Sequence, residues 1–420
     1  MNTSKLPNVE CLVLIGLFFP FFMVVPISSE IQPISLFIWL ISCLLIGRVP
    51  KELLVLCFSL FACAILSLIV SIFSDDIPSV KDFAISFVLF FVPIITFVFV
   101  KNSSAVESRR TFMFVLSVWF LFSLVQTFIP NFFKITGIES IINIFIPRFL
   151  SGAAENGRGV TSLAPEPSYA AYVYLSLVVW LWYLKVSLLV SRRMFTFSFF
   201  TLIFCLLMNK SFFGVLVLLF SIFLFIKIRY LFFVVLVSFV FLFGALGGES
   251  EGRLVSFLML LRNVTNFHDL MILFQTFSST REVGVMVGYS SLVNNPLGVG
   301  VGNGSAHFSE ILGNFSFILM DRYQEIVNPE SGGSGRPYAY VSFMFFEIGL
   351  LFFLPLLVFM TFNLKYLFCK CLLRNNSFFV LFLALVLVSL RSPVSMPCAF
   401  IMMGLLIRSL LSCKVNSKFI

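Results

Sequence analysis

The stretch LLVLCFSLFACAILSLIVSIF, residues 53–73, sets the class of this protein. It carries no charged side chain and is long enough, as a helix, to cross a hydrocarbon core of about 30 Å. Similar runs recur along the 420 residues, of which 60% are hydrophobic and only 11% charged, with a mean hydropathy of +1.07. They do not alternate apolar with polar residues, as the strands of a membrane barrel do. The sequence therefore predicts an all-α polytopic integral membrane protein with a single transmembrane domain, residues 1–420.

We interpret twelve apolar runs as membrane spans. The first begins soon after Lys5, and no small-residue cleavage site follows it, so we expect an uncleaved span instead of a signal peptide. The short runs within 194–226 and 377–411 are joined by tight links, and their boundaries stay open. The predicted spans cover residues 11–28, 32–47, 53–73, 83–100, 111–129, 167–190, 194–208, 212–226, 230–247, 339–361, 377–390 and 396–411.

The positions of the basic residues predict the orientation in the membrane. With the N-terminus in the cytoplasm, most of the 28 Lys and Arg residues fall in short inner loops, where only Glu10, Glu52 and Glu107 oppose them. Lys and Arg crowd the cytoplasmic loops of membrane proteins. We therefore expect both termini in the cytoplasm, and the net charge of +9 indicates orientation, with no implication of nucleic-acid binding.

The cysteines and histidines argue against a disulfide framework and against a metal centre. None of the nine cysteines falls in a predicted outer loop, and the chain has only two histidines. Structural disulfides belong to oxidising compartments, and zinc sites combine three or four Cys, His or carboxylate ligands. The sequence therefore predicts no metal site and no cofactor.

Two long loops are predicted to face outward, over residues 130–166 and 248–338. Aromatic and aliphatic residues run through both, which favours ordered structure over disorder. Residues 253–277 of the larger loop are numerous enough to span, but Arg262 and Asp269 would then lie near the middle of the bilayer at a high cost in free energy. We therefore expect interfacial or re-entrant helices in this loop.

Glu166 is the first candidate catalytic residue. It lies in RGVTSLAPEPSYAAY, residues 158–172, between Pro165 and Pro167, where an apolar helix is predicted to begin. As an anion at a helix N-terminus it would contribute only about 0.3–1 kcal/mol, and Ser, Asp or Asn would cap as well. A carboxylate fixed at the outer membrane face can instead accept a proton or hydrogen-bond a sugar hydroxyl.

Arginines of the outer loops are the candidate phosphate ligands. Arg148, Arg158, Arg281 and Arg336 all fall in the two long loops. A guanidinium binds phosphate oxygens through two parallel hydrogen bonds, which a lysine ammonium cannot do. Solvated loop charges or contacts with lipid headgroups remain the alternative interpretation for each of them.

The glycine-rich stretch NNPLGVGVGNG, residues 294–304, indicates a backbone that can approach a ligand closely. Its glycine spacing does not match the dinucleotide-binding fingerprint. Asn295, Gly300 and Asn303 are its candidate ligand contacts. His307 follows directly and can act as a base near neutral pH.

Glu347 is an acidic residue inside a predicted span, about two turns from its start. Ionisable side chains within the membrane are expensive and usually functional. Its candidate role is substrate binding. An ion pair with an arginine from another helix end is the structural alternative.

Three stretches give the chain a resemblance to a known family. RGVTSLAPEPSYAAY, NNPLGVGVGN and FEIGLLFFLP, at residues 346–355, resemble segments of the O-antigen polymerase family, within the O-antigen ligase/polymerase superfamily. Arg148 and Gly159 also fit the Arg-x10-Gly pattern of such polymerases.

The resemblance implies a metal-independent glycosyltransferase of the bacterial inner membrane, active in lipopolysaccharide synthesis. Such an enzyme joins oligosaccharide units carried on undecaprenyl diphosphate at the periplasmic face. Arg158 and Arg281 are then the first candidates to bind the diphosphate, with Arg148 and Arg336 as the second. Glu166 is the expected base or acceptor-orienting group.

His307 is the second candidate base in the same scheme. The family also implies the lipid bilayer, a chain-length regulator and a flippase as partners. Two alternatives stay open. An O-antigen ligase would use the same donor and transfer to lipid A–core, and a polysaccharide or lipid-linked sugar transporter would need charged residues in several spans, whereas Glu347 is essentially the only one.

Overall fold

The computed structural model describes a mainly helical chain. No strand occurs among the residues that it describes, and one isolated antiparallel bridge joins Ala339 to Pro393. The predicted span at 230–247 and the stretch 253–277 lie outside the described residues. The described residues are 7–23, 31–32, 34–73, 77–146, 159–225, 280–313, 336–359, 361, 381, 384–386, 388–390, 392–394 and 396–416.

The helices begin and end close to the predicted spans. In chain order they are α1 (Pro7–Leu17), α2 (Ser35–Ile46), α3 (Lys51–Phe73), α4 (Val80–Asn102), η1 (Ser104–Glu107), α5 (Arg109–Phe128), α6 (Phe132–Ile135), α7 (Ile138–Phe145), α8 (Pro167–Val186), α9 (Arg192–Asn209), α10 (Phe212–Phe225), α14 (Thr280–Asn294), α15 (Gly304–Gly313), α17 (Tyr340–Ile348), η4 (Gly349–Phe352) and α20 (Cys398–Asn416).

Five helical segments are long and apolar enough to cross a membrane. They are α3, α4, α5, α8 and Tyr340–Phe359, which comprises α17, η4 and the helical residues 353–359. Shorter apolar helices include parts of α1, α2, α10 and α20. The prediction of a helical chain with several membrane-crossing segments is therefore confirmed, while the number of twelve spans stays a prediction.

The first helix is shorter than predicted. It ends at Leu17, although the apolar run continues to residue 28. Pro20 lies just beyond this end, and proline disfavours helical geometry in the residue before it. The chain after the helix instead contacts the end of α7, where Met23 N donates to Phe145 O at 2.7 Å.

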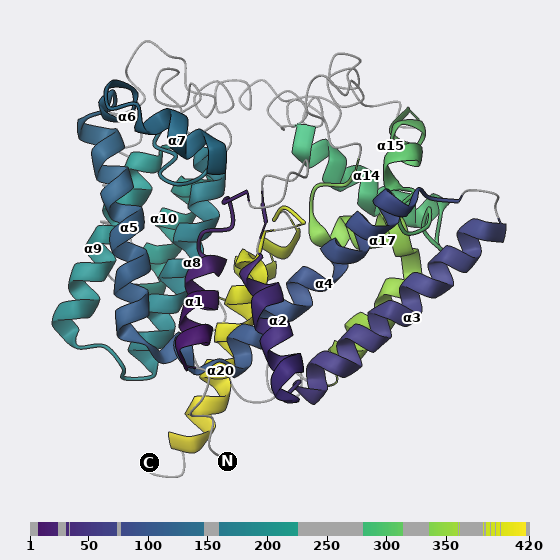
Figure 1. The fold of residues 1–420 in the computed structure, drawn as a ribbon, viewed down its shortest axis with the longest axis horizontal. Helices are drawn as coiled ribbons and strands as arrows, with labels where there is room; N and C mark the ends of the chain where they lie inside the picture. Colours follow the sequence, from purple (N-terminus) through teal and green to yellow (C-terminus); the bar gives the residue numbers. More distant parts are fainter. Residues whose placement is uncertain are drawn as a thin grey trace, which may run out of the picture.

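Helix α8 forms the centre of one half of the molecule. Nearly all of its side chains from Pro167 to Leu184 are buried, and it lies among α1, α5, α9, α10 and α20 (Figure 1). A helix that is apolar all round must be surrounded by others. Trp180 illustrates the packing, since its ring contacts Phe18 at 5.0 Å and Phe112 at 5.2 Å. This burial fixes the N-terminal end of α8, where Glu166 lies.

The other half of the molecule contains α3, α4, α14, α15 and α17. Helix α20 joins the two halves, because it packs against both α4 and α8 (Figure 1). A Cβ built on Gly404 of α20 would lie 2.8 Å from Val100 Cγ1 of α4. Glycine at this position therefore permits the close approach of the two helices.

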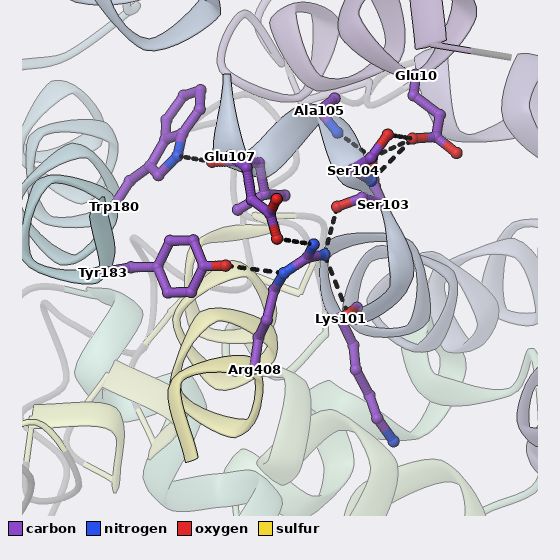
Figure 2. A network of polar contacts seen from close by, with 10 residues as sticks. Glu10, Lys101, Ser103, Ser104, Ala105, Glu107, Trp180, Tyr183 and Arg408 are labelled. Carbon is purple, nitrogen blue, oxygen red and sulfur yellow. Dashed lines mark hydrogen bonds and ion pairs between the residues drawn. The ribbon is translucent and has the colours of Figure 1, made fainter. Parts of the chain in front are cut away.

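Arg408 of α20 ties helix ends together at one end of the molecule. Its Nε donates to the Tyr183 hydroxyl at 2.9 Å, and its Nη2 lies 2.6 Å from Glu107 Oε1 (Figure 2). Its Nη1 donates to the carbonyl oxygens of Lys101, at 3.3 Å, and Ser103. One guanidinium thus links α20 with α8, α4 and η1, using several of its five donors.

Further polar contacts extend this network to α1 and α3. Lys101 Nζ lies 2.8 Å from both carboxylate oxygens of Glu52, and Glu10 Oε2 accepts bonds from Ser103 and Ser104. We name this the basic end, because Lys and Arg residues lie at or near the helix ends on this side. These are Arg48, Lys51, Lys101, Arg109, Arg110, Lys185, Arg192, Arg193 and Arg408.

Candidate functional site

Glu166 begins α8 at the opposite end of the molecule from the basic end. It has extended backbone geometry, with φ −143° and ψ 150°, and its carbonyl accepts the first helical bond from Ala170 N at 3.2 Å. Pro167 occupies the first helical position, as predicted. The Glu166 side chain does not cap the helix, and its Oε2 accepts a bond from Ser168 Oγ at 3.3 Å. The carboxylate is half-buried, so capping does not explain why a glutamate stands here.

The segment before Glu166 is fixed by a buried polar cluster on α5. Gln126 Oε1 accepts from Ser162 N, and Gln126 Nε2 donates to Ser162 O, both at 2.8 Å. The Ser162 hydroxyl also bonds the hydroxyls of Ser123 and Tyr174. Ser162 has a φ of 52°, which an L residue adopts only when its surroundings impose it. These paired buried groups hold the segment in one conformation.

The end of α9 fixes the same segment from another side. Asn209 Nδ2 donates to Val160 O at 3.1 Å and to Pro167 O at 2.8 Å. Gly159 has a φ of 98°, and a Cβ built on it would lie 1.9 Å from Asn209 O. Only glycine fits here. The close approach to Asn209 therefore explains why a glycine stands at position 159, the glycine of the Arg-x10-Gly pattern.

Two tyrosines join this segment to the chain around Arg336. The hydroxyl of Tyr169, in the first turn of α8, hydrogen-bonds the hydroxyl of Tyr338. The ring of Tyr169 stacks on Phe21 at 5.9 Å, and Val394 N donates to Tyr338 O at 2.9 Å. The structure thus brings the start of α8 beside a segment that is far away in sequence.

Arg336 forms an ion pair with Asp82 in the first turn of α4. Its Nη2 lies 3.0 Å from Asp82 Oδ1, and the two side chains are 13% and 37% exposed. Ser79 holds the carboxylate in place, donating from Oγ to Asp82 Oδ2 at 2.7 Å and capping α4 through Asp82 N. A guanidinium has five N–H donors, so it can hold Asp82 and a second anion together. Sequence reasoning missed Asp82, although the Ser-x-x-acid capping pattern marked it.

Glu347 is completely buried and bonded to protein groups. Its Oε1 accepts from Ser86 Oγ at 3.0 Å, and its Oε2 accepts from Gly302 N at 3.1 Å. Its backbone oxygen accepts from Gly300 N at 3.0 Å and from Ser67 Oγ at 3.2 Å. The glutamate therefore connects α17 with α3, α4 and the glycine-rich stretch.

The glycines allow two backbones to come together. Gly298, Gly300 and Gly302 have φ values of 78°, 95° and 92°, and a Cβ on Gly298 would lie 2.5 Å from Glu347 O. Gly349, with φ 64°, ends α17, and the segment Tyr340–Phe359, which matches the predicted span at 339–361, continues from there through the 3-10 helix η4. A Cβ on Gly349 would lie 2.3 Å from Gly298 N. These glycines therefore let the backbone of the glycine-rich stretch lie against the backbone at the end of α17.

The remaining candidates of this stretch lie around the same contact. Asn303 is buried, and its Nδ2 donates to Val299 O at 3.3 Å, while Asn295 O accepts from Gly298 N at 2.9 Å. His307 lies in the first turn of α15 and its Nδ1 is 3.5 Å from Glu310 Oε2. The substrate roles expected for Asn295, Gly300, Asn303 and Glu347 stay predictions, and the polar contacts described for them are with protein.

Arg281 lies in the first turn of α14, next to the Arg336 segment. A Cβ built on Gly284, one turn later, would lie 3.8 Å from both Arg336 O and Tyr338 N. The backbone of α14 near Arg281 therefore lies close to the Arg336–Tyr338 segment, and the Tyr338 hydroxyl connects that segment to Tyr169, three residues after Glu166. Arg148 and Arg158 lie outside the described residues.

The arrangement offers a carboxylate, an arginine and two hydroxyls at the end of the molecule opposite the basic end. Sequence reasoning had selected Glu166 and Arg336 separately, and it missed the tyrosines that join them, because tyrosines are common at membrane interfaces. Among the described residues, no three His, Cys, Asp or Glu side chains lie close enough to hold a metal ion. The independence of the reaction from metals stays a prediction.

No protein-family model matches the chain, and no curated protein matches it.

Proposed function

We propose that this protein is an O-antigen polymerase, which joins undecaprenyl-diphosphate-linked oligosaccharide units at the periplasmic face of a bacterial inner membrane. The proposal combines the family resemblance of three sequence stretches with one structural observation. That observation is the contact between Tyr169 and Tyr338, which brings the Glu166 carboxylate and the Arg336 guanidinium to adjoining segments.

The reaction needs a base for a hydroxyl and cations for a leaving diphosphate. A hydroxyl oxygen of the acceptor unit forms the new bond to the reducing-end anomeric carbon of the donor chain. The bond from that carbon to the diphosphate oxygen breaks, and undecaprenyl diphosphate leaves with the electron pair. Glu166 accepts the proton of the attacking hydroxyl. His307 is the second candidate for this step.

Arginines stabilise the charge that develops on the leaving diphosphate. The Nη2 of Arg336 lies 3.0 Å from Asp82 Oδ1, and its guanidinium carries five N–H donors in all. The backbone of Arg281 lies in the first turn of α14, one turn before Gly284, which is close to Arg336 O. Arg158 precedes Glu166 by eight residues in the sequence, and Arg148 belongs to the same predicted loop. A planar guanidinium suits a diphosphate better than an ammonium does.

Besides its predicted substrate role, Glu347 positions part of the protein in this proposal. Its carboxylate holds Gly302 N, and α15 with His307 begins two residues later at Gly304. A carboxylate near the first turn of a helix also stabilises that helix through the positive end of its dipole. Glu347 is thus a positioning residue for the glycine-rich stretch.

The proposal includes a topology and a set of partners. Twelve spans with both termini in the cytoplasm place Glu166 and Arg336 outside, where the lipid-linked units are presented. A flippase supplies these units and a chain-length regulator acts on the product, as the resemblance implies.

The test is the pattern of lipopolysaccharide bands from cells that lack this protein. A polymerase mutant retains a single O-unit on the core and loses the ladder of longer chains. Loss of every O-unit from the core would identify a ligase instead. An unchanged ladder would contradict both.

A further inference from the structure

An apolar groove of about 830 Å³ opens between α2, α3 and α4. Its walls include Leu40 and Leu44 of α2, Leu53 and Phe61 of α3, and Phe87 and Ile95 of α4. Every lining side chain is aliphatic or aromatic except the thiol of Cys57. Several of them, such as Phe61 and Val88, are more than a third exposed, so the groove is open at its side.

The groove has the depth of a single leaflet. Residues 53–61 of α3 and 87–95 of α4 each rise about 12 Å along their helices, at about 1.5 Å per residue. One leaflet is half of a hydrocarbon core of about 30 Å. Because Leu53 lies near the first turn of α3, the groove begins at the basic end and reaches the middle of the membrane-crossing segment.

Basic side chains stand at the mouth of this groove. Arg48 lies between the lining residues Leu44 and Val49, and Lys51 lies between Val49 and Leu53; both basic side chains are exposed. The nearby acid Glu52 is bound by Lys101 at 2.8 Å. The local charge at the mouth is therefore positive. The apolar groove behind it has the depth of a single leaflet.

We propose that this groove binds an anionic phospholipid of the leaflet at the basic end. One acyl chain lies in the groove between α3 and α4, and Arg48 and Lys51 contact the phosphate of the headgroup. Basic positions next to clefts between membrane helices are suited to such headgroups. The site is independent of the proposed glycosyl transfer, because Glu166 and Arg336 lie at the opposite end.

Purified, delipidated protein titrated with phosphatidylglycerol or phosphatidylcholine, with bound lipid counted by native mass spectrometry, tests this site. We expect one phosphatidylglycerol to bind more tightly than phosphatidylcholine. Arg48→Gln with Lys51→Gln should weaken phosphatidylglycerol binding roughly 30-fold, which is about 2 kcal/mol, or about 1 kcal/mol for each basic side chain. Val88→Trp should weaken the binding of both lipids by filling the groove.

Arg109→Gln with Arg110→Gln is the matched control, because it removes two exposed charges from the basic end away from the groove. It should leave binding unchanged. Equal losses in both double variants would overturn the site in favour of general surface charge, and so would full binding by Val88→Trp. Equal affinity for the two phospholipids would overturn the role of the basic pair. Displacement of phosphatidylglycerol by an equal concentration of a polyprenyl diphosphate would assign the groove to that lipid and contradict the proposal.

Discussion

Tyr169 and Tyr338 share a hydrogen bond through their hydroxyls across 169 positions of sequence. Tyr169 lies three residues after Glu166, and Tyr338 lies two residues after Arg336. Each partner segment is fixed independently, the first by Gln126 and the second by the contact with Val394. The bond therefore links the segment of the proposed base to the segment of the proposed diphosphate ligand.

Replacing Tyr338 with Phe should weaken this link without removing the ring. The loss of one hydrogen bond should lower the free energy of unfolding by about 0.5–1.5 kcal/mol. Small displacements of reacting groups cost up to about 10²-fold in rate, so the polysaccharide ladder should shorten markedly.

Tyr289→Phe is the matched control for Tyr338→Phe. The Tyr289 hydroxyl is buried and has no hydrogen-bond partner among the described residues. Its removal should be neutral or slightly stabilising. If both variants gave the wild-type ladder and the same unfolding midpoint, the tyrosine pair would have no positioning role.

Glu347→Gln should loosen the glycine-rich stretch. A glutamine presents an NH₂ group where the carboxylate accepts from Ser86 Oγ or Gly302 N, so one buried donor loses its acceptor. The expected cost is about 1–3 kcal/mol of folding stability, seen as a lower midpoint of thermal unfolding in detergent. Glu310→Gln is the control, since that side chain is 73% exposed and should leave the midpoint unchanged. Equal midpoints for the two variants would mean that the Glu347 contacts do not stabilise the fold.

Gly159→Ala should prevent the segment before Glu166 from packing. The added Cβ would lie 1.9 Å from Asn209 O, at a φ of 98°. We expect a large loss of folded protein in the membrane, as measured by the monodisperse fraction after extraction. Gly137→Ala is the control, because its φ of 70° imposes only the backbone cost of about 1–2 kcal/mol and nothing lies within 4 Å. Similar yields from both variants would show that the close approach to Asn209 is not required.

Arg281→Lys and Arg158→Lys should lose most polymerisation although they keep the charge. A lysine ammonium cannot reproduce the two parallel bonds of a guanidinium to a diphosphate. The measurement is the ladder at matched membrane levels, with Arg109→Lys at the basic end as the control. The alanine variants Arg281→Ala and Arg158→Ala complete the test. If they lost the ladder while the lysine variants kept it, the arginines would contribute only positive charge to diphosphate binding.

The sequence predicted the helices well where one physical signal was sufficient. Apolar length located α3, α4 and α5, and the pair of prolines around Glu166 located the start of α8. The early end of α1 could have been predicted from Pro20, since the residue before a proline resists helical geometry. The prediction that most Lys and Arg residues face one side of the membrane is compatible with the basic end, where residues such as Arg48 and Arg408 lie.

Contacts between segments that are distant in sequence could not be predicted. The glycines at 298 and 349 each signal close approach, but nothing in either stretch says that they approach each other. The hydrogen bonds of Gln126 to Ser162 likewise join residues whose neighbours are unremarkable. Such pairings depend on how helices pack, and a single sequence carries no direct signal of them.

The most direct test of the account is the effect of Glu166→Gln on chain polymerisation. An amide can orient the acceptor hydroxyl but cannot take its proton, so transfer should slow by roughly 10²–10⁴-fold while the protein stays folded. Each variant is expressed at matched membrane levels in a strain lacking the protein, with Glu139→Gln in α7 as the control. We predict single O-units from Glu166→Gln and a full ladder from Glu139→Gln. A full ladder from Glu166→Gln would contradict the assignment of Glu166 as the base.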